Sequence, residues 1–501
     1  MNELEKILDV TFPNNTVIIN ATNSTKKVEK NSIFFGLQGT KVHGSKYIEE
    51  ALSLGASICI HDDSKYKSNK ANVFYIDDLS KRTDMFTNKE SEQKTRIYYF
   101  LEYLYEMQNT NKHNIRAFTG TNGKTSSAYL CHQLLLNKGM NSLYIGTIGA
   151  QLNNKALNNS ICKKTTPDIF EFFEILNALE IRNNINICIE ISSHALDQAR
   201  LNDLSFFTSC LLNIGKDHLD YHKSIEDYTN TKLSIFNSSS QLKLINADLK
   251  PIASYKKIDR GLPLTSISNS NELANVYYKI IESGVNGALF EVQTSSQIHL
   301  SQDSNKRRRY KFQCKLFPDF NIDNLIFAIE SSGYETFLEE GINNLNFLTL
   351  PKGRTELVPN ISSNVIIDYA HNAQGFIFFL SSIKDYFSSI VIVFGCGGER
   401  DKKKRPEMLK IAIKNAREVI FTSDNSRSED FKQIFADSLK GNEGKKVIVI
   451  EDRKEAIIHG SNLIGDNDCL VILGKGHEQT QEINGKTFYF SDHEVVNEIY
   501  K

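Results

Sequence analysis

Tryptophan is absent from the 501-residue chain, and proline, methionine and cysteine are scarce, with 8, 5 and 8 residues. The cysteines are scattered and no two form a C-x-x-C pair, which argues against a disulfide framework or a zinc ribbon. Several lie inside apolar runs such as Ile58-Cys59-Ile60, as small buried hydrophobes do, and this pattern favours a reducing compartment.

Long apolar runs are also missing, since none approaches the roughly 20 residues that a membrane-spanning helix needs. The opening residues MNELEKILDV carry acids early and do not resemble a signal peptide. The formal net charge is −1, so no global field attracts nucleic acid or an anionic membrane. We therefore expect a cytoplasmic protein that binds neither a membrane nor nucleic acid.

The chain is longer than one domain with a single hydrophobic core usually is. We divide it into three segments, 1–94, 95–347 and 348–501. In the first segment the pattern predicts strands at 32–36 and 56–60 and a helix at 46–54. In the second it predicts a strand at 114–118, a helix at 125–136 and a strand at 142–145. Such alternation predicts a parallel sheet covered on both faces. The Ser-, Asn- and Lys-rich stretch from 237 to 309 gives no clear boundaries.

The third segment repeats the strand–helix order, with apolar runs at 365–367, 389–394, 418–421 and 469–473. Each run ends in a polar loop. Ligands of open α/β sheets bind beyond the carboxyl ends of the strands, so these loops predict a binding surface. The loops contain GRTE at 353–356, DYAHN at 368–372, FGCGGERD at 394–401, SDNSR at 423–427 and GKGHE at 474–478.

The sharpest local motif is Thr119-Gly-Thr-Asn-Gly-Lys-Thr125, between the strand at 114–118 and the following helix. Glycines let the backbone approach phosphate oxygens, and the helix N-terminus supplies aligned N–H groups. Lys124 is expected to bridge the outer phosphates of a nucleotide, and the Thr125 hydroxyl to bind magnesium. Phe118 stands where the longer G-x-x-x-x-G-K-[ST] motif has its first glycine.

Two further stretches carry chemically useful side chains. A strand ending at Glu190 places a carboxylate where magnesium could be bound, although a helix cap or a surface ion pair would look the same. Asp217, His218, Asp220 and His222 lie close together in the next stretch. Their spacing fits a metal site, but it favours helix capping in a solvated polar turn. By spacing alone Lys232 is an ordinary surface lysine.

Taken together, these motifs resemble the Mur ligases of peptidoglycan synthesis, most closely the type that adds the third residue of the stem peptide. The matching units are TGTNGKTS at Thr119, TTPD at Thr165, EISSHALDQAR at Glu190 and DHLDYH at Asp217. The phenylalanine-asparagine unit at Phe320 and the third-segment loops complete the set. The resemblance spans nearly the whole chain. It implies a three-domain α/β fold: a small N-terminal uridine-binding domain, a central P-loop ATPase domain with a parallel sheet, and a C-terminal Rossmann-like domain for the incoming amino acid.

The implied reaction is ATP-dependent. The D-glutamate carboxylate of UDP-MurNAc-L-Ala-D-Glu is phosphorylated, and the amino acid attacks the resulting acyl phosphate. The catalytic residues implied are Lys124, Glu190, His218 and Lys232. The resemblance assigns ATP to Gly120, Thr121, Asn122, Gly123, Lys124, Thr125, Asn321, Arg354 and Asp368. The resemblance assigns magnesium binding to Thr125, Glu190, His218 and Lys232. It implies that Lys232 is carbamylated, which turns its side chain into a carboxylate-like ligand.

By the same resemblance, the UDP-MurNAc-dipeptide is held by Ser24, Thr40, Lys41, Val42, Thr165, Thr166, Ser192, Gln198 and Arg200. Asn23-Ser24-Thr25 departs from the family's usual D-S-R at the uridine end. The incoming amino acid is assigned to Arg400, Asp424, Asn425, Ser426, Arg427, Gly474 and Glu478. We expect the enzyme to act as a monomer.

The third residue is expected to be meso-diaminopimelate. Family members that add it carry D-N-P-R, and here the unit reads Asp424-Asn425-Ser426-Arg427, with the arginine kept. An arginine that pairs with the distal carboxylate would be left unpaired by lysine. The alternatives are L-lysine as third residue, a related folylpolyglutamate-type ligase, and a nucleotide-binding regulator without catalysis.

Overall fold

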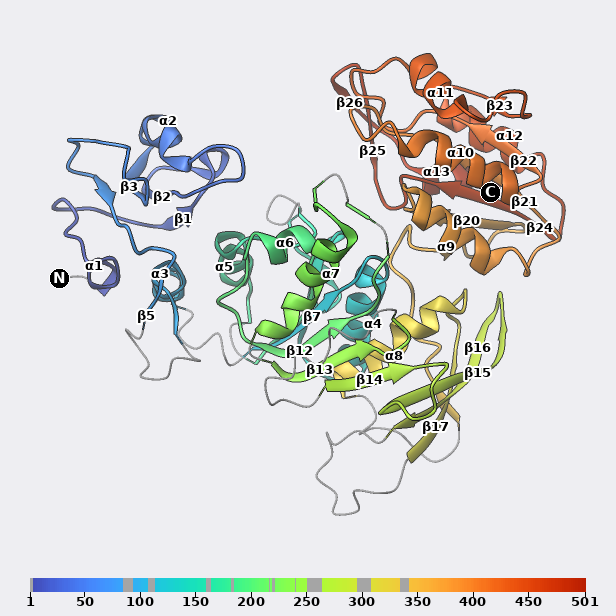
Figure 1. Ribbon diagram of the computed structural model, residues 1–501, viewed down its shortest axis with the longest axis horizontal. Helices are drawn as coiled ribbons and strands as arrows, with labels where there is room; N and C mark the ends of the chain where they lie inside the picture. Colours follow the sequence, from blue (N-terminus) through green and yellow to red (C-terminus); the bar gives the residue numbers. More distant parts are fainter. Residues whose placement is uncertain are drawn as a thin grey trace. The chain divides into compact units, whose positions relative to one another are not determined.

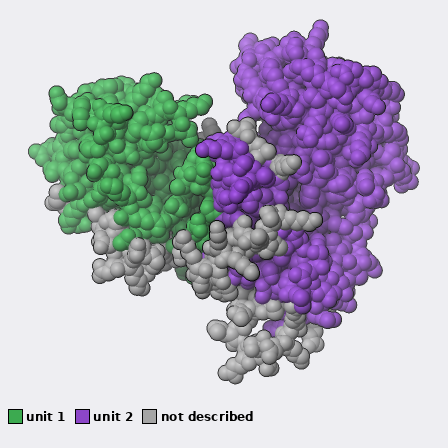
Figure 2. All heavy atoms as spheres, viewed as in Figure 1, with its two compact units in different colours: residues 1–117, 139–208, 234–241 green, residues 118–138, 209–233, 242–501 purple. Residues whose placement is uncertain are grey.

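The computed structural model describes residues 3–83, 93–106, 113–158, 164–181, 184–215, 217–218, 221–238, 240–249, 264–294, 308–333 and 342–501. The chain forms two compact units, coloured separately in Figure 2. The first comprises residues 1–117, 139–208 and 234–241, and the second residues 118–138, 209–233 and 242–501. Asp220 of the sequence motif at 217–222 lies outside the described residues.

The first unit begins with a four-stranded parallel sheet in the order β1-β2-β3-β4 (Figure 1). Its strands are β1 (Asn20–Thr22), β2 (Ser32–Gly36), β3 (Ala56–His61) and β4 (Val73–Tyr75). Helix α2 (Ile48–Ser53) follows a 3₁₀ turn at Gly44–Tyr47 and buries Ile48 and Ala51 against Phe34 and Cys59. Both strands and the helix predicted in this segment are confirmed.

The remainder of the first unit continues the strand–helix alternation. Its elements are α1 (Glu3–Leu8), a 3₁₀ turn (Thr25–Lys27), β5 (Arg82–Thr83), β6 (Lys94–Thr95), α3 (Arg96–Leu104), β8 (Ser142–Gly146), β9 (Gly149–Leu152), β10 (Lys155–Ala156), α5 (Ile169–Asn177), β11 (Asn186–Glu190) and α6 (Ser193–Asp197). Strands β8 and β11 pair in parallel, so their carboxyl ends at Gly146 and Glu190 lie at one edge. Strand β9 turns back antiparallel against β8.

Three strands contain residues of both units: β7 (Asn114–Thr119), β12 (Phe206–Leu211) and β13 (Ser240–Asn246). The second unit adds α4 (Lys124–Asn137), α7 (Ile225–Leu233), a 3₁₀ turn (Ser234–Asn237, shared with the first unit), β14 (Leu264–Ser268), β15 (Val276–Gly284), β16 (Gly287–Thr294), β17 (Arg308–Cys314), α8 (Phe320–Ser332) and β18 (Ile342–Asn344). Strands β15, β16 and β17 form an antiparallel meander. This meander lies mostly in the Ser-, Asn- and Lys-rich stretch whose boundaries the sequence left unclear. The parallel pairing expected from the strand–helix alternation is present between β8 and β11.

The C-terminal part of the second unit has a sheet in the order β19-β20-β24-β21-β22-β23. Its strands are β19 (Glu356–Leu357), β20 (Asn364–Asp368), β21 (Ser389–Phe394), β22 (Glu418–Phe421), β23 (Ile448–Val449) and β24 (Asp468–Leu473). All but β19 run parallel, so the loops after β20, β21, β22 and β24 leave from one edge. The four strands predicted in this segment are confirmed.

Helices and a hairpin complete this part: α9 (Ala373–Ile383), α10 (Lys404–Asn415), α11 (Phe431–Leu439), α12 (Arg453–Ser461), α13 (Asp492–Ile499), and the hairpin of β25 (Thr480–Ile483) and β26 (Lys486–Tyr489). Two apolar clusters bury the two faces of the sheet. One holds Ile392 and Phe394 with Leu380, and the other holds Val391 and Ile457. Within the described part of the chain, no helix is both long and apolar enough to cross a membrane.

Candidate active site

The loop at residues 119–125, called the phosphate loop below because it is expected to bind phosphates, connects β7 to α4. Gly123 has φ +83°, and a Cβ there would lie 2.2 Å from the Asn324 side-chain oxygen, so only glycine fits. Asn213 fixes the loop from the next strand end: its side chain accepts from the Asn122 N–H at 2.9 Å and donates to the Asn122 carbonyl at 3.0 Å. The Lys124 ammonium donates to the carbonyls of Gly120 and Thr121 at 2.9 and 3.0 Å. Thr125, on the first turn of α4, is buried.

Lys232 on α7 is not the surface lysine that its spacing suggested, because it is fully buried. Its amine donates to the Gly120 carbonyl at 2.9 Å and lies 4.7 Å from the centre of the Tyr228 ring. Burial, reinforced by the nearby Lys124 charge, holds the pKa of Lys232 well below its ordinary value. The Tyr228 hydroxyl lies 3.0 Å from the Thr121 hydroxyl, which ties α7 to the phosphate loop.

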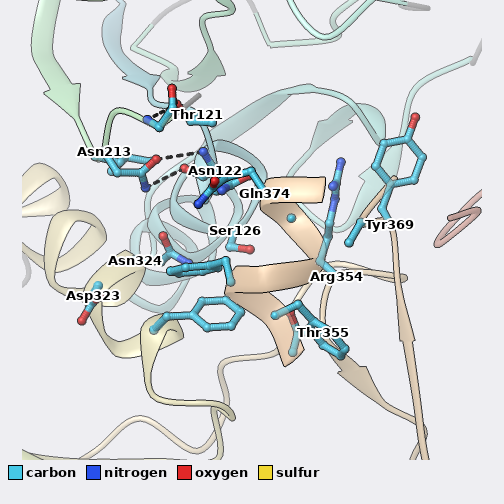
Figure 3. Close-up of a pocket in the computed structure, with 18 of the residues that line it drawn as sticks. Thr121, Asn122, Ser126, Asn213, Asp323, Asn324, Arg354, Thr355, Tyr369 and Gln374 are labelled. Atoms are coloured by element: carbon cyan, nitrogen blue, oxygen red, sulfur yellow. Dashed lines mark hydrogen bonds between the residues drawn. The ribbon is translucent and has the colours of Figure 1, made fainter. Parts of the chain in front are cut away.

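A cavity of about 350 Å³ in the second unit lies between the phosphate loop on one side and, on the other, the residues before β19 and the loop after β20 (Figure 3). Figure 3 shows Thr121, Asn122 and Ser126 on one side and Arg354, Thr355 and Tyr369 on the other. The ring of Phe320 and the side chain of Asn324, both on α8, also line it. Polar groups at the loops and aromatic rings on the helix suit a nucleotide, with its charged phosphates and flat base.

Asn321, which the resemblance assigns to ATP, is buried but is not among the residues that line this cavity. Its amide donates to the Phe317 carbonyl at 3.0 Å and accepts from the Asn324 amide at 3.1 Å. The structure therefore places Asn324, three residues later on the same helical face, at the cavity wall, with Asn321 holding it.

Arg354 and Asp368 meet at the C-terminal side of the cavity. The Asp368 carboxylate accepts from the backbone N–H groups of Thr355 and Ala370 at 2.6 and 2.7 Å. Burial raises the pKa of Asp368, and the Arg354 charge opposes that shift. The Arg354 guanidinium lies 4.4 Å from the centre of the Tyr369 ring, and among the described residues no hydrogen-bond partner for its buried Nε is found. A cation with an unused donor at the cavity wall suits a phosphate oxygen.

Glu190 occupies the carboxyl end of β11 in the first unit, where it is fully buried. Its carboxylate accepts from the Tyr144 hydroxyl at 2.5 Å, and from the Thr147 N–H and hydroxyl at 2.8 and 3.1 Å. Gly146 leaves room for this arrangement, because a Cβ there would lie 2.1 Å from the Glu190 Oε1. Tyr144 and Thr147 were missed from the sequence; their signal was their place at the end of the strand neighbouring that of Glu190.

The residues expected along the dipeptide path gather around Glu190. Thr165 lies 3.2 Å from Thr147 through their hydroxyls. The Thr166 hydroxyl donates to the Glu190 carbonyl at 2.8 Å and accepts from the Ser192 N–H at 2.9 Å. The Arg200 guanidinium donates to the Thr166 carbonyl at 2.9 Å and to the Gln198 side chain at 3.0 Å. All five expected residues, Thr165, Thr166, Ser192, Gln198 and Arg200, therefore belong to one network.

At the uridine end, Ser24 follows β1 and the turn with Thr40, Lys41 and Val42 follows β2. The Ser24 N–H donates to the Thr22 hydroxyl at 3.1 Å, and the Gly39 N–H donates to the Val42 carbonyl at 3.2 Å. Strands β1 and β2 are parallel neighbours, so both segments leave from the carboxyl edge of the same sheet. The three turn residues are exposed.

The loops expected to hold the amino acid converge at the carboxyl edge of the C-terminal sheet. The Asn425 amide donates to the Glu478 carboxylate at 3.0 Å. The buried Lys475 ammonium donates to both, at 3.3 and 3.1 Å, and was missed from the sequence although it lies within GKGHE. Gly474 has φ +111°, and a Cβ there would come within 2.6 Å of an Asp424 carboxylate oxygen. Asp424 and Glu478 thus lie at one edge of the sheet, with the Glu478 carboxylate paired to Lys475.

Arg427 has φ +52° and forms an isolated β-bridge with Ile483. Its guanidinium donates to the Gly398 carbonyl at 2.5 Å and lies 3.5 Å from the Glu482 carboxylate. The preceding Ser426 is buried, whereas Arg400, after β21, is exposed. The structure therefore brings the loops after β21 and β22 together through the contact of Arg427 with Gly398, whereas the Arg400 side chain is exposed to solvent.

His218 lies in the second unit, with φ +51° and its ring 3.7 Å from the Asp217 carboxylate. The described residues contain no cluster of three or more His, Cys, Asp or Glu side chains able to hold a metal. The expected magnesium ligands are of another kind: a threonine hydroxyl, a carboxylate, one imidazole and a lysine. Glu190 belongs to the first unit and the other three to the second, so their joint action stays a prediction.

Three family profiles match the chain. They are described as the Mur ligase family catalytic domain at residues 21–93, the Mur ligase middle domain at 118–331 and the Mur ligase glutamate ligase domain at 353–476. One match falls in each of the three expected segments. The three-domain α/β architecture expected from the sequence is confirmed.

Full-length relatives are found among characterised proteins. The UDP-N-acetylmuramoyl-L-alanyl-D-glutamate--2,6-diaminopimelate ligase of Aquifex aeolicus (strain VF5) is 34% identical over 95% of this chain and 92% of its own length. The ligase of the same name from Clostridium perfringens (strain 13 / Type A) is 30% identical over 99% and 96%. A solved structure with that ligase name shares 27% identity and a TM-score of 0.63 over 99% of this chain and 98% of its own. The chain belongs to the Mur ligase family.

Proposed function

We propose that this chain is an ATP-dependent amide ligase that joins meso-diaminopimelate to the D-glutamate of UDP-MurNAc-L-Ala-D-Glu in peptidoglycan precursor synthesis. The observation that carries the proposal is the full-length similarity to ligases of that name, at 34% and 30% identity. The arrangement of the second unit supports it, because a phosphate loop and an acid-lined amino-acid edge occur in the same unit.

In the first step the D-glutamate carboxylate attacks the γ-phosphate of ATP, forming an acyl phosphate and releasing ADP. The backbone N–H groups of Gly120 to Thr125 hold the phosphates, and Lys124 exchanges its two carbonyl partners for phosphate oxygens as charge develops. Asn324 and Arg354 line the nucleotide cavity. Thr125, Glu190, His218 and Lys232 are the residues that would hold magnesium, which would supply further neutralisation of phosphate charge.

Lys232 fits that metal set only in a modified form, since an ammonium repels a cation. Its lowered pKa favours the neutral amine, and a neutral amine can react with carbon dioxide to give a carbamate and a proton. The carbamate provides the oxygen anion that a magnesium site prefers. The burial of Lys232 next to the Gly120 carbonyl supports this assignment.

In the second step the amino group of diaminopimelate attacks the acyl phosphate, and the tetrahedral intermediate collapses to amide and phosphate. Asp424 and Glu478 orient the ammonium end, and Arg427 pairs with the distal carboxylate. Thr165, Thr166, Ser192, Gln198 and Arg200 hold the dipeptide, and Ser24 with Thr40 to Val42 meets the uridine. We assign these roles to domains at 1–94, 95–347 and 348–501 of a cytoplasmic monomer.

The test follows phosphate release from ATP by purified protein while each substrate is omitted in turn. Release is expected only when both the UDP-muramoyl dipeptide and diaminopimelate are present. With ¹⁸O in the D-glutamate carboxylate, one label should appear in the phosphate, because the acyl phosphate breaks between carbon and the bridging oxygen. Phosphate release that depends on neither substrate would refute the ligase assignment.

A further inference from the structure

Two buried side chains, neither of them assigned to a substrate, hold the loops at 424–427 and 474–478 that are expected to bind the incoming amino acid. Arg453 begins α12 and Asp492 begins α13, and both are almost completely buried. The pair is bidentate: Arg453 Nε and Nη2 each lie 2.8 Å from one oxygen of the Asp492 carboxylate. A planar guanidinium held in this way has a fixed orientation.

The remaining donors of Arg453 point at the backbone of two different loops. Nη2 also donates to the Leu473 carbonyl at 3.1 Å, and Nη1 donates to the Ser423 carbonyl at 3.4 Å. Leu473 directly precedes Gly474, and Ser423 directly precedes Asp424. The same guanidinium therefore holds the residue that precedes the Asp424 loop and the residue that precedes the Glu478 loop.

Side-chain hydrogen bonds also link these loops, among them the one from the Asn425 amide to the Glu478 carboxylate at 3.0 Å. The Gln481 amide reinforces the first loop by donating to the Ser423 hydroxyl and the Asp424 carbonyl at 2.8 and 3.0 Å. Lys475 links Asn425 to Glu478 further along. These contacts are made by side chains of the loops themselves and of β25, whereas Arg453 holds main-chain atoms at the start of each loop, where a small shift moves every side chain that follows.

We propose that Arg453, oriented by Asp492, is a positioning residue that sets the spacing between the Asp424–Arg427 loop and the Gly474–Glu478 loop, and thereby the affinity for the incoming amino acid. This inference rests on the proposed function. It assigns no substrate contact to Arg453, which acts through the two carbonyl groups that it holds.

Arg453→Lys keeps the charge and the pairing with Asp492 but cannot hold both carbonyls. A misplacement of about 1 Å can cost about 100-fold in rate. We expect the KM for diaminopimelate to rise by about 10- to 100-fold, while the KM for ATP stays within about twofold. The double variant Arg453→Met/Asp492→Leu removes both charges together, which avoids an unpaired buried charge, and it should show the same split.

Ile457→Ala is the matched control, because Ile457 is a fully buried residue of the same helix that packs in the sheet core. It should lower thermal stability and leave both KM values unchanged. A wild-type KM for diaminopimelate in both Arg453 variants would overturn the proposal, as would an equal rise in the KM for ATP.

Amide hydrogen exchange gives a readout that does not depend on catalysis. Peptides covering 423–427 and 474–478 should exchange faster in Arg453→Lys than in wild type, relative to β20, and should not do so in Ile457→Ala. Unchanged exchange in Arg453→Lys would overturn the positioning role. Inactivity of the wild-type protein with diaminopimelate would instead overturn the proposed function and leave this arm intact.

Discussion

Among single residues, Lys232 shows most clearly how burial changes chemistry. Its sequence neighbours are polar, and nothing in its spacing marks it as special. In the folded chain Lys232 lies next to the carbonyl of Gly120, a residue 112 positions earlier in the sequence, and it is buried away from water. The pKa of Lys232 falls because the charged form loses solvation and faces Lys124. Both effects favour the neutral amine over the ammonium.

The first prediction concerns that amine. Lys232→Ala should lower ligation by at least about 100-fold, the scale of losing one preorganised charged group, and added bicarbonate should not restore it. Wild-type protein in ¹³C-bicarbonate should give a carbamate ¹³C resonance that the variant lacks. Lys223→Ala, at an exposed lysine, is the control and should keep both activity and resonance. Full activity in Lys232→Ala would remove the carbamate from the account.

Gly146 gives a second prediction at the same scale. Gly146→Ala would bring a Cβ to 2.1 Å from Glu190 Oε1 and 2.3 Å from the Tyr144 hydroxyl, so the carboxylate must move. We expect kcat to fall by about 10- to 100-fold, with a higher magnesium requirement. Gly284→Ala is the control, since its Cβ would meet nothing within 4 Å. Wild-type kcat and magnesium dependence in Gly146→Ala would contradict the role given to Glu190.

The arrangement of the strands explains why much of the site could be predicted from the sequence. Parallel strands share a carboxyl edge, so the polar loops after β20, β21, β22 and β24 were expected to meet, and they do. The meander β15–β17 was not anticipated, because its exposed face is polar and interrupts the apolar pattern. Spacing also could not separate Asn321 from Asn324, since both lie on one helical face and only packing decides which reaches the cavity.

A pH-dependent contact between Arg405 on α10 and Glu429, in the loop before α11, gives the third prediction. Hydrogen bonding by Arg405 lowers the pKa of Glu429 to about 2 from its ordinary 4.5. Because the folded-state pKa is the lower one, the stabilisation is complete above about pH 4.5 and is lost as pH falls towards 2. Glu429→Gln should destabilise the protein by about 1.5–3 kcal/mol at pH 7.

Thermal unfolding of wild type, Glu429→Gln and the exposed control Glu407→Gln at pH 7 and pH 3 measures this contribution. The Tm difference between wild type and Glu429→Gln should be large at pH 7 and smaller at pH 3. Glu407→Gln should match wild type at both. A difference that grows on acidification would contradict the contact.

For the whole molecule, the residues with proposed roles are divided between the two units. The first holds Glu190 and the residues proposed to bind the dipeptide, and the second holds the phosphate loop, Lys232 and the loops proposed to bind the amino acid. Composition indicated only a multidomain globular protein. The order of the motifs along the chain indicated the family, and several of these motifs lie directly after a strand. The interlocking contacts of Tyr144, Lys475 and Arg453 could not be predicted, since their partners are distant in sequence or are backbone carbonyls.

The most direct test of the central claim offers the purified protein ATP, UDP-MurNAc-L-Ala-D-Glu and an equimolar mixture of meso-diaminopimelate and L-lysine. Mass spectrometry then identifies the ligated product. Because Arg427 would be left without a carboxylate partner by lysine, the account predicts the diaminopimelate product in large excess, with one phosphate released per amide formed. A lysine product in excess, or phosphate release without any amide, would contradict it.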